Sequence, residues 1–381
     1  MRPVRDPRRS GHRPDLARNG DLRPQATLVV PVLRIALRDL LWRRRRFVFT
    51  TLGVAVVFGL TLVITGVSTG FLSEANNTVN EMGASAWIVR NGADGPFLGS
   101  SPFSDKTVGL VRNLPGVDRA VATVYTHRDV VSGGRVISVN VFGAPTGDLG
   151  MPAPSTGRQP TESHQIMIST KLKGFPIGSQ LILAAHPFTV VGQVDNSTAL
   201  AGTPNVFVTL AGAQLVAFNG LPVASAVAIR GSPLRVPDGL AVVSNAAARD
   251  DLLRALGSAR SSITLIAFLL WLVAALIVGS IVYVSVLERQ REFAVFKATG
   301  MSTLSILESL SAQAIALSLV AALLGIVISI FIQPLFPLPV TLTINAFLLL
   351  PLIAVVVGLL ASFVGLRKAV SVEPALAFAG P

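Results

Sequence analysis

The chain alternates between long stretches that lack charged side chains and segments rich in polar residues. Asp, Glu, Lys and Arg are absent from Phe47 to Ser73, from Ser261 to Leu287 and from Ser309 to Leu366. A helix that crosses a membrane needs about 20 apolar residues, because it rises about 1.5 Å per residue through about 30 Å of hydrocarbon. Each of the first two stretches fits one such helix. The third fits two, because Gln333-Pro334 and Pro337-Leu338-Pro339 interrupt it and proline cannot donate a helical hydrogen bond.

We therefore predict a membrane protein in which one transmembrane helix, a large domain and three more transmembrane helices follow one another. Only 14% of the residues are charged, against about 25% in an average soluble domain. The helices are expected near 47–70, 263–286, 309–331 and 345–366. The predicted parts are, in order, a disordered basic tail at 1–27, an amphipathic interfacial helix at 28–46, a first span at 47–72, an extracytoplasmic domain at 73–260, a second span at 261–287, a cytoplasmic loop at 288–308, a third span at 309–331, an outer loop at 332–344, a fourth span at 345–366 and a cytoplasmic tail at 367–381.

Most of the excess positive charge lies before the first span. Residues 1–46 contain 13 arginines and four aspartates, whereas residues 68–260 contain 14 basic and 12 acidic residues. Cytoplasmic flanks of membrane helices carry such an excess. Arg43 to Arg46 therefore predict a cytoplasmic N-terminus, and Arg367-Lys368 predict a cytoplasmic C-terminus. We expect the protein to lie in the cell (inner or plasma) membrane. Anionic lipid headgroups are the expected counter-charge. The alternative is a nucleic-acid-binding arm, but the adjacent span explains the arginines, and we expect no nucleic acid partner.

Between the tail and the first span, the pattern predicts an amphipathic helix on the inner membrane surface. Leu33, Leu37 and Leu40 recur at helical spacing, while Arg34 and Arg38 share another face. A plain cytoplasmic extension of the first span would give nearly the same pattern. A cleaved signal peptide is a further alternative, but the long preceding segment and the long apolar run favour a retained helix.

The extracytoplasmic domain alternates between short β-like runs and helical stretches, which predicts a mixed α/β fold. The β-like runs are Ala86–Val89, Val121–Tyr125, Val136–Phe142, Gln165–Ile168, Leu181–Ala184, Phe188–Val194 and Asn205–Thr209. The helical stretches are Lys106–Asn113, Leu210–Phe218 and Ala246–Gly257. We predict a β-rich middle from 136 to 209, after which residues 210–260 return to pack with residues 74–135.

Residue patterns that would indicate an enzyme are mostly absent. The chain has no cysteine, no H-E-x-x-H and no G-x-x-x-x-G-K-[ST] loop that could bind ATP. Gly66-Val67-Ser68-Thr69-Gly70 matches G-x-S-x-G, but a hydrolase elbow needs a turn from strand to helix, whereas this motif ends a span. The four histidines, at 12, 127, 164 and 186, have no ligand-like spacing. We therefore expect no catalytic residue, no metal site and no cofactor bound by this chain.

Small residues recur at packing intervals in two of the predicted spans. Gly66 and Gly70 are four residues apart near the outer end of the first span, and Ala275 and Gly279 are four apart in the second. Small residues let helix backbones approach closely in lipid. These four positions are candidates for helix packing, although such pairs also arise by chance in apolar helices.

The cytoplasmic loop after the second span begins with a charged segment. Glu288 and Glu292 are four residues apart, and Arg289, Arg291 and Lys297 lie between and after them. Opposite charges three or four residues apart stabilise a helix. The segment therefore predicts a short charged helix, and a solvated loop that merely follows the positive-inside rule is the alternative.

The same loop carries apolar and capping residues. Phe293 and Phe296 are three residues apart, so they share a helical face. Gly300 suits a left-handed helix end, and Ser302 can cap the next helix. Two aromatic rings in a small loop favour a protein partner, because aromatic residues anchor interfaces.

This loop resembles that of the FtsX/MacB-like family of ABC transporter permeases, where a Glu-Arg-x-x-Glu stretch, a Lys-Ala pair and a Gly follow the second span. Glu288-Arg289, Glu292, Lys297-Ala298 and Gly300 match that order. Weaker likenesses extend the resemblance over residues 28–376, and the chain length is nearest to DevC-like four-helix permeases without a fused ATPase. The segments that carry these weaker likenesses are Arg34 to Leu41 with Thr51 to Ala55, Gly157-Arg158, Ile166 to Ser169, Ile177-Gly178, Phe188 to Gly192 and Val372 to Leu376.

The resemblance implies an extracytoplasmic domain of MacB periplasmic-core type and a permease that moves a lipid, lipoprotein, peptide or drug-like substrate by mechanotransmission. A separate ABC ATPase subunit would bind ATP, and a second permease chain would complete a dimer, most simply a homodimer. An extracytoplasmic adaptor or hydrolase is a further partner it allows. The segment after the second span would act as a coupling helix that docks on the ATPase. Its implied docking residues are Glu288, Arg289, Arg291, Glu292, Phe293, Phe296, Lys297, Ala298 and Gly300. Phe293 and Phe296 depart from the smaller aliphatic residues common there, so the partner's groove is expected to differ.

Three other functions stay open at this point. An FtsX-like signal transmitter would activate a cell-wall hydrolase, although the predicted outer domain is larger than that role usually shows. A membrane receptor would sense a ligand with the outer domain, but no cytoplasmic part is large enough to signal alone. An enzyme would need a catalytic set, which the sequence lacks.

Overall fold

The computed structural model describes residues 44–132, 134–298 and 302–370. The predicted tail at 1–27, nearly all of the predicted interfacial helix at 28–46 and most of the predicted tail at 367–381 lie outside the described residues. The chain divides into two compact units, residues 1–47 and 48–381, and the second contains almost every described residue.

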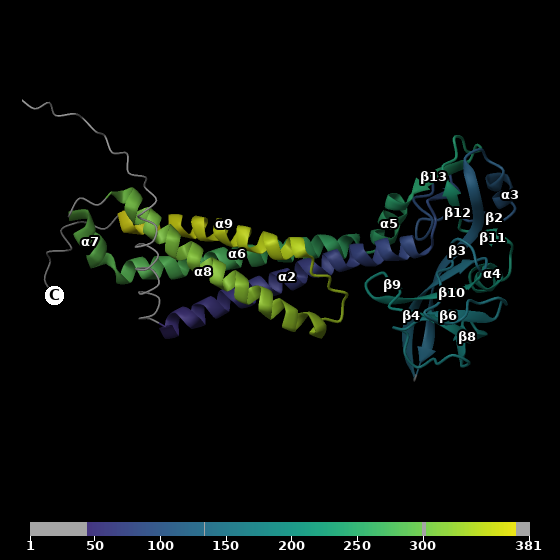
Figure 1. The fold of residues 1–381 in the computed structure, drawn as a ribbon, viewed down its shortest axis with the longest axis horizontal. Helices are drawn as coiled ribbons and strands as arrows, with labels where there is room; N and C mark the ends of the chain where they lie inside the picture. The colour runs from purple at the N-terminus through teal and green to yellow at the C-terminus, as the bar shows by residue number, and fades with distance from the viewer. Residues whose placement is uncertain (1–43, 133, 299–301, 371–381) are drawn as a thin grey trace, which may run out of the picture. The chain divides into compact units, whose positions relative to one another are not determined.

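In the described part of the chain, four helices are long and apolar enough to cross a membrane, and in sequence one precedes the large domain and three follow it, as predicted (Figure 1). They are α2 (Arg44–Glu81), α6 (Gly257–Glu288), α8 (Thr303–Ile332) and α9 (Ile344–Val370). The 3-10 helix η2 (Gln333–Leu335) and the non-helical segment up to Thr343 separate α8 from α9. The prolines at 334, 337 and 339 thus mark the interruption that the sequence predicted.

Helix α2 continues well beyond the predicted first span. The span was expected to end at residue 72, but the helix runs to Glu81 and has 38 residues, or about 57 Å at 1.5 Å per residue. The polar residues of its last turns have partners in the following domain, so they do not end the helix. It stops just before Gly83, whose φ of 67° is the left-handed conformation that favours glycine.

The large domain is built on an 11-stranded mixed sheet, with a separate pair of short strands. The main path of the sheet runs β13-β1-β12-β3-β4-β10-β6-β8-β5. The strands are β1 (Ala86–Arg90), β2 (Phe103–Ser104), β3 (Val117–Ser132), β4 (Arg135–Ala144), β5 (Thr156–Gly157), β6 (Gln165–Ser169), β7 (Gln180–Leu183), β8 (His186–Val194), β9 (Thr198–Ala199), β10 (Thr203–Thr209), β11 (Val223–Ala224), β12 (Ala226–Gly231) and β13 (Leu240–Ser244). The helices are α3 (Thr107–Arg112), α4 (Leu210–Phe218) and α5 (Asn245–Arg254).

The 16-residue strand β3 is shared by two halves of this domain. Its first part pairs with β12, from Val117 to Thr123, and its second part pairs with β4, from Val124 to Ser132. On the first side, β12 and β13 both pair with β1, which confirms that residues 210–260 return to pack with residues 74–135. The strands from β4 to β10 form the β-rich middle.

Candidate functional site

The charged segment after α6 forms the short helix α7 (Gln290–Ala298), between the ends of α6 and α8 (Figure 1). Glu288 is the last residue of α6, and the N–H of Arg289 donates to the carbonyl of Val286 at 3.2 Å, where the chain turns. Ser302 caps the start of α8, because its Oγ accepts a hydrogen bond from the N–H of Ser305 at 3.2 Å. The predicted helix and the predicted cap are both present.

One ion pair joins the turn to α7. Arg289 Nε donates to Glu292 Oε2 at 2.6 Å, and the Glu292 side chain is about half exposed. Arg291 is exposed as well, whereas Ala294 is fully buried. The helix therefore presents Arg291 and Glu292 outward and packs Ala294 inward.

The other predicted docking residues can be placed only in part. Phe293, Phe296, Lys297 and Ala298 lie along α7, but their side chains are outside the described part of the structure. Gly300 lies wholly outside the described residues. The docking role of the set stays a prediction.

Helix α8 is hydrogen-bonded to α6, on the other side of α7, and packs closely against α9. Gln313 Nε2 of α8 donates to Ser285 Oγ of α6 at 3.3 Å, and Ser311 Oγ of α8 donates to Ser362 Oγ of α9 at 3.0 Å. At Gly358 of α9 a Cβ would lie 2.9 Å from the main-chain nitrogen of Ile315, so the two helix backbones are in contact. Displacement of α7 would therefore act on a bundle and not on a single helix.

Helix α2 crosses α8 at a pair of glycines that the sequence did not single out. A Cβ on Gly59 would lie 2.9 Å from the carbonyl oxygen of Gly325, and a Cβ on Gly325 would lie 3.0 Å from the carbonyl oxygen of Ala55. Glycines at such crossings allow close approach of backbones in lipid. Close by, the Phe58 ring lies 5.5 Å from the Trp271 ring of α6.

The predicted helix-packing residues of the first span contact a loop. The N–H of Thr341 donates to the carbonyl of Gly66 at 3.0 Å, and a Cβ on Gly70 would collide with the carbonyl oxygen of Pro339. The segment between α8 and α9 thus lies on α2 at both glycines. Because α2 stays helical through this motif, it also forms no hydrolase elbow at Ser68.

The predicted packing residues of the second span are less closely approached. A Cβ on Gly279 would lie 4.0 Å from the Cα and Cβ atoms of Ala361 in α9, which is ordinary contact. Ala275 is partly buried on α6.

At its outer end α2 carries two glutamates that contact the segment around β9. Glu74 Oε1 accepts a hydrogen bond from Thr198 Oγ1, and Glu74 Oε2 accepts one from the N–H of Gly202 at 3.2 Å. Glu81 Oε2 accepts one from Ser197 Oγ at 2.9 Å. No sequence pattern singled out these residues, although Glu74 is the first charged residue after the uncharged stretch.

Helix α6 is joined to the same domain through α5. Asp251 of α5 is fully buried, and it accepts hydrogen bonds from the N–H of Phe97 at 2.8 Å and from the N–H of Gly99 at 2.9 Å. Arg254 forms an ion pair with Asp94 and lies 3.5 Å from Asp251. The loop around Phe97 is thus held by the helix that leads into the second span.

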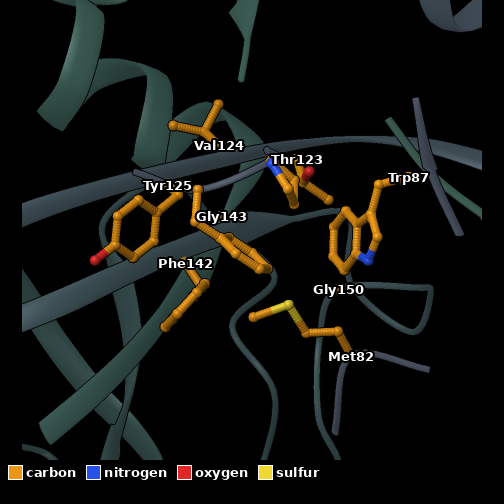
Figure 2. Close-up of a pocket in the computed structure, with 10 residues that line it drawn as sticks. Met82, Trp87, Thr123, Val124, Tyr125, Phe142, Gly143 and Gly150 are labelled. Atoms are coloured by element: carbon orange, nitrogen blue, oxygen red, sulfur yellow. The ribbon is translucent and has the colours of Figure 1, made fainter. Parts of the chain in front are cut away.

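Trp87, Tyr125 and Phe142 surround a small cavity (Figure 2), and their aromatic core also contains Phe97. The Phe97 ring lies 5.1 Å from Trp87, 5.7 Å from Tyr125 and 5.9 Å from Phe142, all near edge-to-face. Burial, with the nearby charge of Asp251, raises the pKa of the Tyr125 hydroxyl, which donates to Asn140 Oδ1 at 3.1 Å. The cavity volume of about 10 Å³ admits at most one water molecule, so it is no substrate chamber.

The described residues contain no group of three or more His, Asp or Glu side chains placed to hold a metal ion. His127 Nδ1 lies 3.1 Å from Asn140 Oδ1, and His164 Nδ1 lies 3.1 Å from Ser163 Oγ. Both histidines thus make contacts with neutral polar side chains.

Comparison with known proteins identifies the family. The FtsX-like permease C-terminal model matches residues 264–374, and the MacB-like periplasmic core domain model matches residues 47–252. Two uncharacterized ABC transporter permeases of Mycobacterium tuberculosis (strain H37Rv) are 46% and 45% identical over 350 residues, which is 92% of this chain and 100% of each relative. The periplasmic region of MacB from Actinobacillus actinomycetemcomitans aligns with a TM-score of 0.33 and 12% identity, over 46% of this chain and 96% of that one.

The chain belongs to the FtsX/MacB-like family of ABC transporter permeases. The predicted family is therefore confirmed, as is the fold class of four apolar helices with a mixed α/β domain of periplasmic-core type. Membership implies that this is a membrane protein with an ATPase partner.

Proposed function

We propose that this chain is the permease subunit of an exporter in which a separate ATPase subunit binds and hydrolyses ATP. Helix α7 docks on that subunit, and nucleotide-driven closure displaces α6, α8 and α9 together. Their movement is then passed to the outer domain, which moves a lipid, lipoprotein, peptide or drug-like substrate on the outer side of the membrane. The chain itself would bind no cofactor and catalyse no reaction.

The position of α7 is the observation that carries this proposal. It is a nine-residue charged helix between two membrane helices that are bonded to each other through Gln313 and Ser285. A helix with exposed charges and a buried small residue suits docking on a protein surface, since charged rims set the orientation of an interface. Because α6 and α8 both begin or end at this segment, a push on α7 is delivered to both.

Two further observations support a mechanical mode over passage through a lumen. The uncharged stretches of the spans provide no Asp, Glu, Lys, Arg or His side chain for a hydrophilic path. The aromatic cavity of the outer domain is too small for any substrate of the proposed classes. Substrate would therefore be moved by the outer domains of two paired permease chains.

Docking is tested by two substitutions on α7, one that reverses a charge and one that replaces an aromatic residue with a charged one. We expect Glu292→Lys and Phe296→Asp in the full chain to lower co-purification of the ATPase subunit and its permease-dependent ATP hydrolysis. Glu162→Lys, a reversal at an exposed position of the outer domain, is the matched control and should leave both unchanged. Unchanged ATPase binding in both α7 variants would refute docking at this helix.

The proposed topology places both termini and α7 in the cytoplasm. The chain has no cysteine, so single substitutions give clean labels for a membrane-impermeant maleimide. Exposed Arg291→Cys should be protected in intact cells, whereas exposed Lys173→Cys in the outer domain should be labelled. Labelling of residue 291 from outside would exclude an inner ATPase at α7.

An FtsX-like transmitter that activates a cell-wall hydrolase would use the same movement of the membrane helices and the outer domain. The two roles differ in the event that the movement of the outer domain triggers. Loss of export in the α7 variants with normal cell-wall hydrolysis supports the exporter, and the reverse result supports the transmitter.

A further inference from the structure

The outer end of α2 and the segment 197–202 of the outer domain form a polar contact that we call the latch. Its helix side consists of Glu74, Thr78 and Glu81, which are spaced for one helical face. Besides the two glutamate contacts described above, Thr78 Oγ1 donates to the carbonyl of Thr198 at 3.1 Å, across 120 residues of sequence. The latch therefore joins the first membrane helix directly to the β-rich middle.

The latch is buried around Glu74, Thr78 and Ser197, whereas Glu81 at its outer edge is exposed. Glu74 is 8% exposed, Thr78 is 2% exposed and Ser197 is 3% exposed. Among the described residues neither glutamate of the latch has an ion-pair partner, so hydroxyl and main-chain donors alone compensate the loss of water at Glu74. Buried polar groups of this kind lose much of their stabilisation when one partner is removed.

The loop side of the latch has a strained backbone. Asn196, Leu200 and Ala201 have φ values of 48°, 52° and 66°, in the left-handed region that residues with a Cβ rarely occupy. Such conformations persist only where surrounding contacts hold them, and they cluster at segments that switch. The antiparallel pairing of β9 with β10 on either side of this turn and the bonds to Glu74 and Thr78 together supply that hold.

The far side of the loop is fixed to the sheet. Asn205 Nδ2 donates to Ser197 Oγ at 3.1 Å, and Asn140 Nδ2 donates to the carbonyl of Ala199 at 3.4 Å and to Asn205 Oδ1 at 3.0 Å. Both asparagines are fully buried, on the paired parallel strands β4 and β10. A displacement of the loop therefore reaches the centre of the β-rich middle.

The loop also meets the turn between α8 and α9. A Cβ on Gly202 would lie 3.6 Å from Cδ of Pro339, and Pro339 itself lies against Gly70 of α2. Helix α2, the turn after α8 and the loop of the outer domain thus converge within one turn of Glu74. A change in the crossing of α2 and α8 would act on the loop from two sides.

We propose that Glu74 is the positioning residue through which α2 holds segment 197–202 and passes its movement to the β-rich middle. This inference rests on the proposed function, because it needs an ATP-driven movement of the spans. When Glu74 or its hydroxyl partner is removed, the loop relaxes from its left-handed backbone and stops following the helix. ATP hydrolysis by the partner continues, and the outer domain no longer responds.

The test is amide hydrogen exchange on the full chain with its ATPase subunit in nanodiscs, with and without ATP. We expect the amides of 197–203 to change exchange on ATP binding in the wild type. In Glu74→Ala and Thr198→Val they should exchange about tenfold faster and show no response to ATP, because a hydrogen bond to a buried carboxylate is lost. Thr198→Ser keeps the hydroxyl and should restore the response, and Thr69→Val, whose hydroxyl bonds only to its own helix, should not alter it.

The outcomes separate this inference from the proposed function. A wild-type complex that responds to ATP, with variants that respond equally, overturns the role of Glu74 and leaves the proposed function standing. A wild-type chain that neither binds the ATPase nor responds to ATP overturns both. A merely structural role would change the exchange rate in the variants but keep its dependence on ATP, and that result also refutes the inference.

Discussion

Helices α2 and α6 each approach the outer domain with a buried carboxylate, yet the two attachments are built differently. Asp251, on α5 before α6, is fully buried, whereas Glu74 on α2 is 8% exposed. Both accept hydrogen bonds from main-chain N–H groups of a loop, at Phe97 and Gly99 for Asp251 and at Gly202 for Glu74. The same chemistry thus serves at both helices.

The loops that they hold differ in strain and in what lies beneath them. Residues 94–99 contain no positive φ, and the Phe97 ring is packed among other rings. Segment 197–202 includes Leu200 and Ala201 in the left-handed region and rests on buried asparagines. A buried aromatic ring stabilises far more than a few neutral hydrogen bonds. The attachment of α6 is therefore a fixed anchor, and that of α2 is the one that can release.

The largest effect is expected at the anchor. Asp251→Ala would leave the N–H groups of Phe97 and Gly99 without their acceptor and free the loop, so we expect a loss of about 3 kcal/mol in the free energy of unfolding. Thermal unfolding of the full chain in detergent measures this. Asp250→Ala is the control, because Asp250 is exposed and pairs with its neighbour Arg249. Equal costs for the two variants would contradict an anchor at Asp251.

A smaller effect of opposite sign is expected at the strained loop. Ala201→Gly should raise the free energy of unfolding by about 1 kcal/mol, because glycine adopts the left-handed conformation without the steric cost that a Cβ brings. Ala185→Gly, in the turn between β7 and β8 and also with φ of 66°, should give a similar gain. Destabilisation by Ala201→Gly, measured by the same unfolding, would show that the loop carries no strain.

The smallest effect is expected at the segment that contains Asp148 and Gly150. This segment covers the end of α2, where the N–H of Gly150 donates to the carbonyl of Met82. Burial of Asp148 opposes its ionisation, but the hydrogen bond and charge of Arg119 outweigh this and lower the pKa of Asp148. The pair thus contributes above the unfolded carboxyl pKa of about 4, and the contribution disappears as pH falls through the lower folded pKa. Because Arg119 is exposed and water screens the pair, we expect only a small contribution to stability.

The comparison is between wild type and Asp148→Asn, with stability measured from pH 6 down to pH 2. The wild type should lose more stability than the variant over the acid part of this range. Parallel curves for the two proteins would show that Asp148 does not help to hold the end of α2.

The spans and several strands could be predicted from the sequence because local patterns determine them. Uncharged runs of sufficient length and the prolines after Gln333 place the four helices, and helix α4 coincides with the predicted Leu210–Phe218. Strands β12 and β13 were not predicted. They pair with β1 and β3, which lie far earlier in the sequence, so the fold and not a local pattern determines them.

The contacts at the helix ends were beyond local patterns. Glu74 and Thr198 are 124 residues apart, and Asp251 is 154 residues from Phe97, so only the fold brings them together. Gly59 and Gly325 lie in different helices, and neither belongs to a G-x-x-x-G pair. The Gly66 and Gly70 pair could be found from its spacing, but nothing in the spacing indicates that a loop contacts it.

The strand shared by both halves of the outer domain limits how that domain can be dissected. Nine residues of β3, from Val124 to Ser132, face β4. Deleting residues 136–209 would remove the strand that pairs with this part of β3. The long unpaired edge that remains would favour association between chains. Conversely, in the intact domain the main path of the sheet passes from one half to the other along β3, whose partner changes from β12 to β4 at Val124. A tilt of the membrane helices that twists β3 at this residue would rotate the β-rich middle.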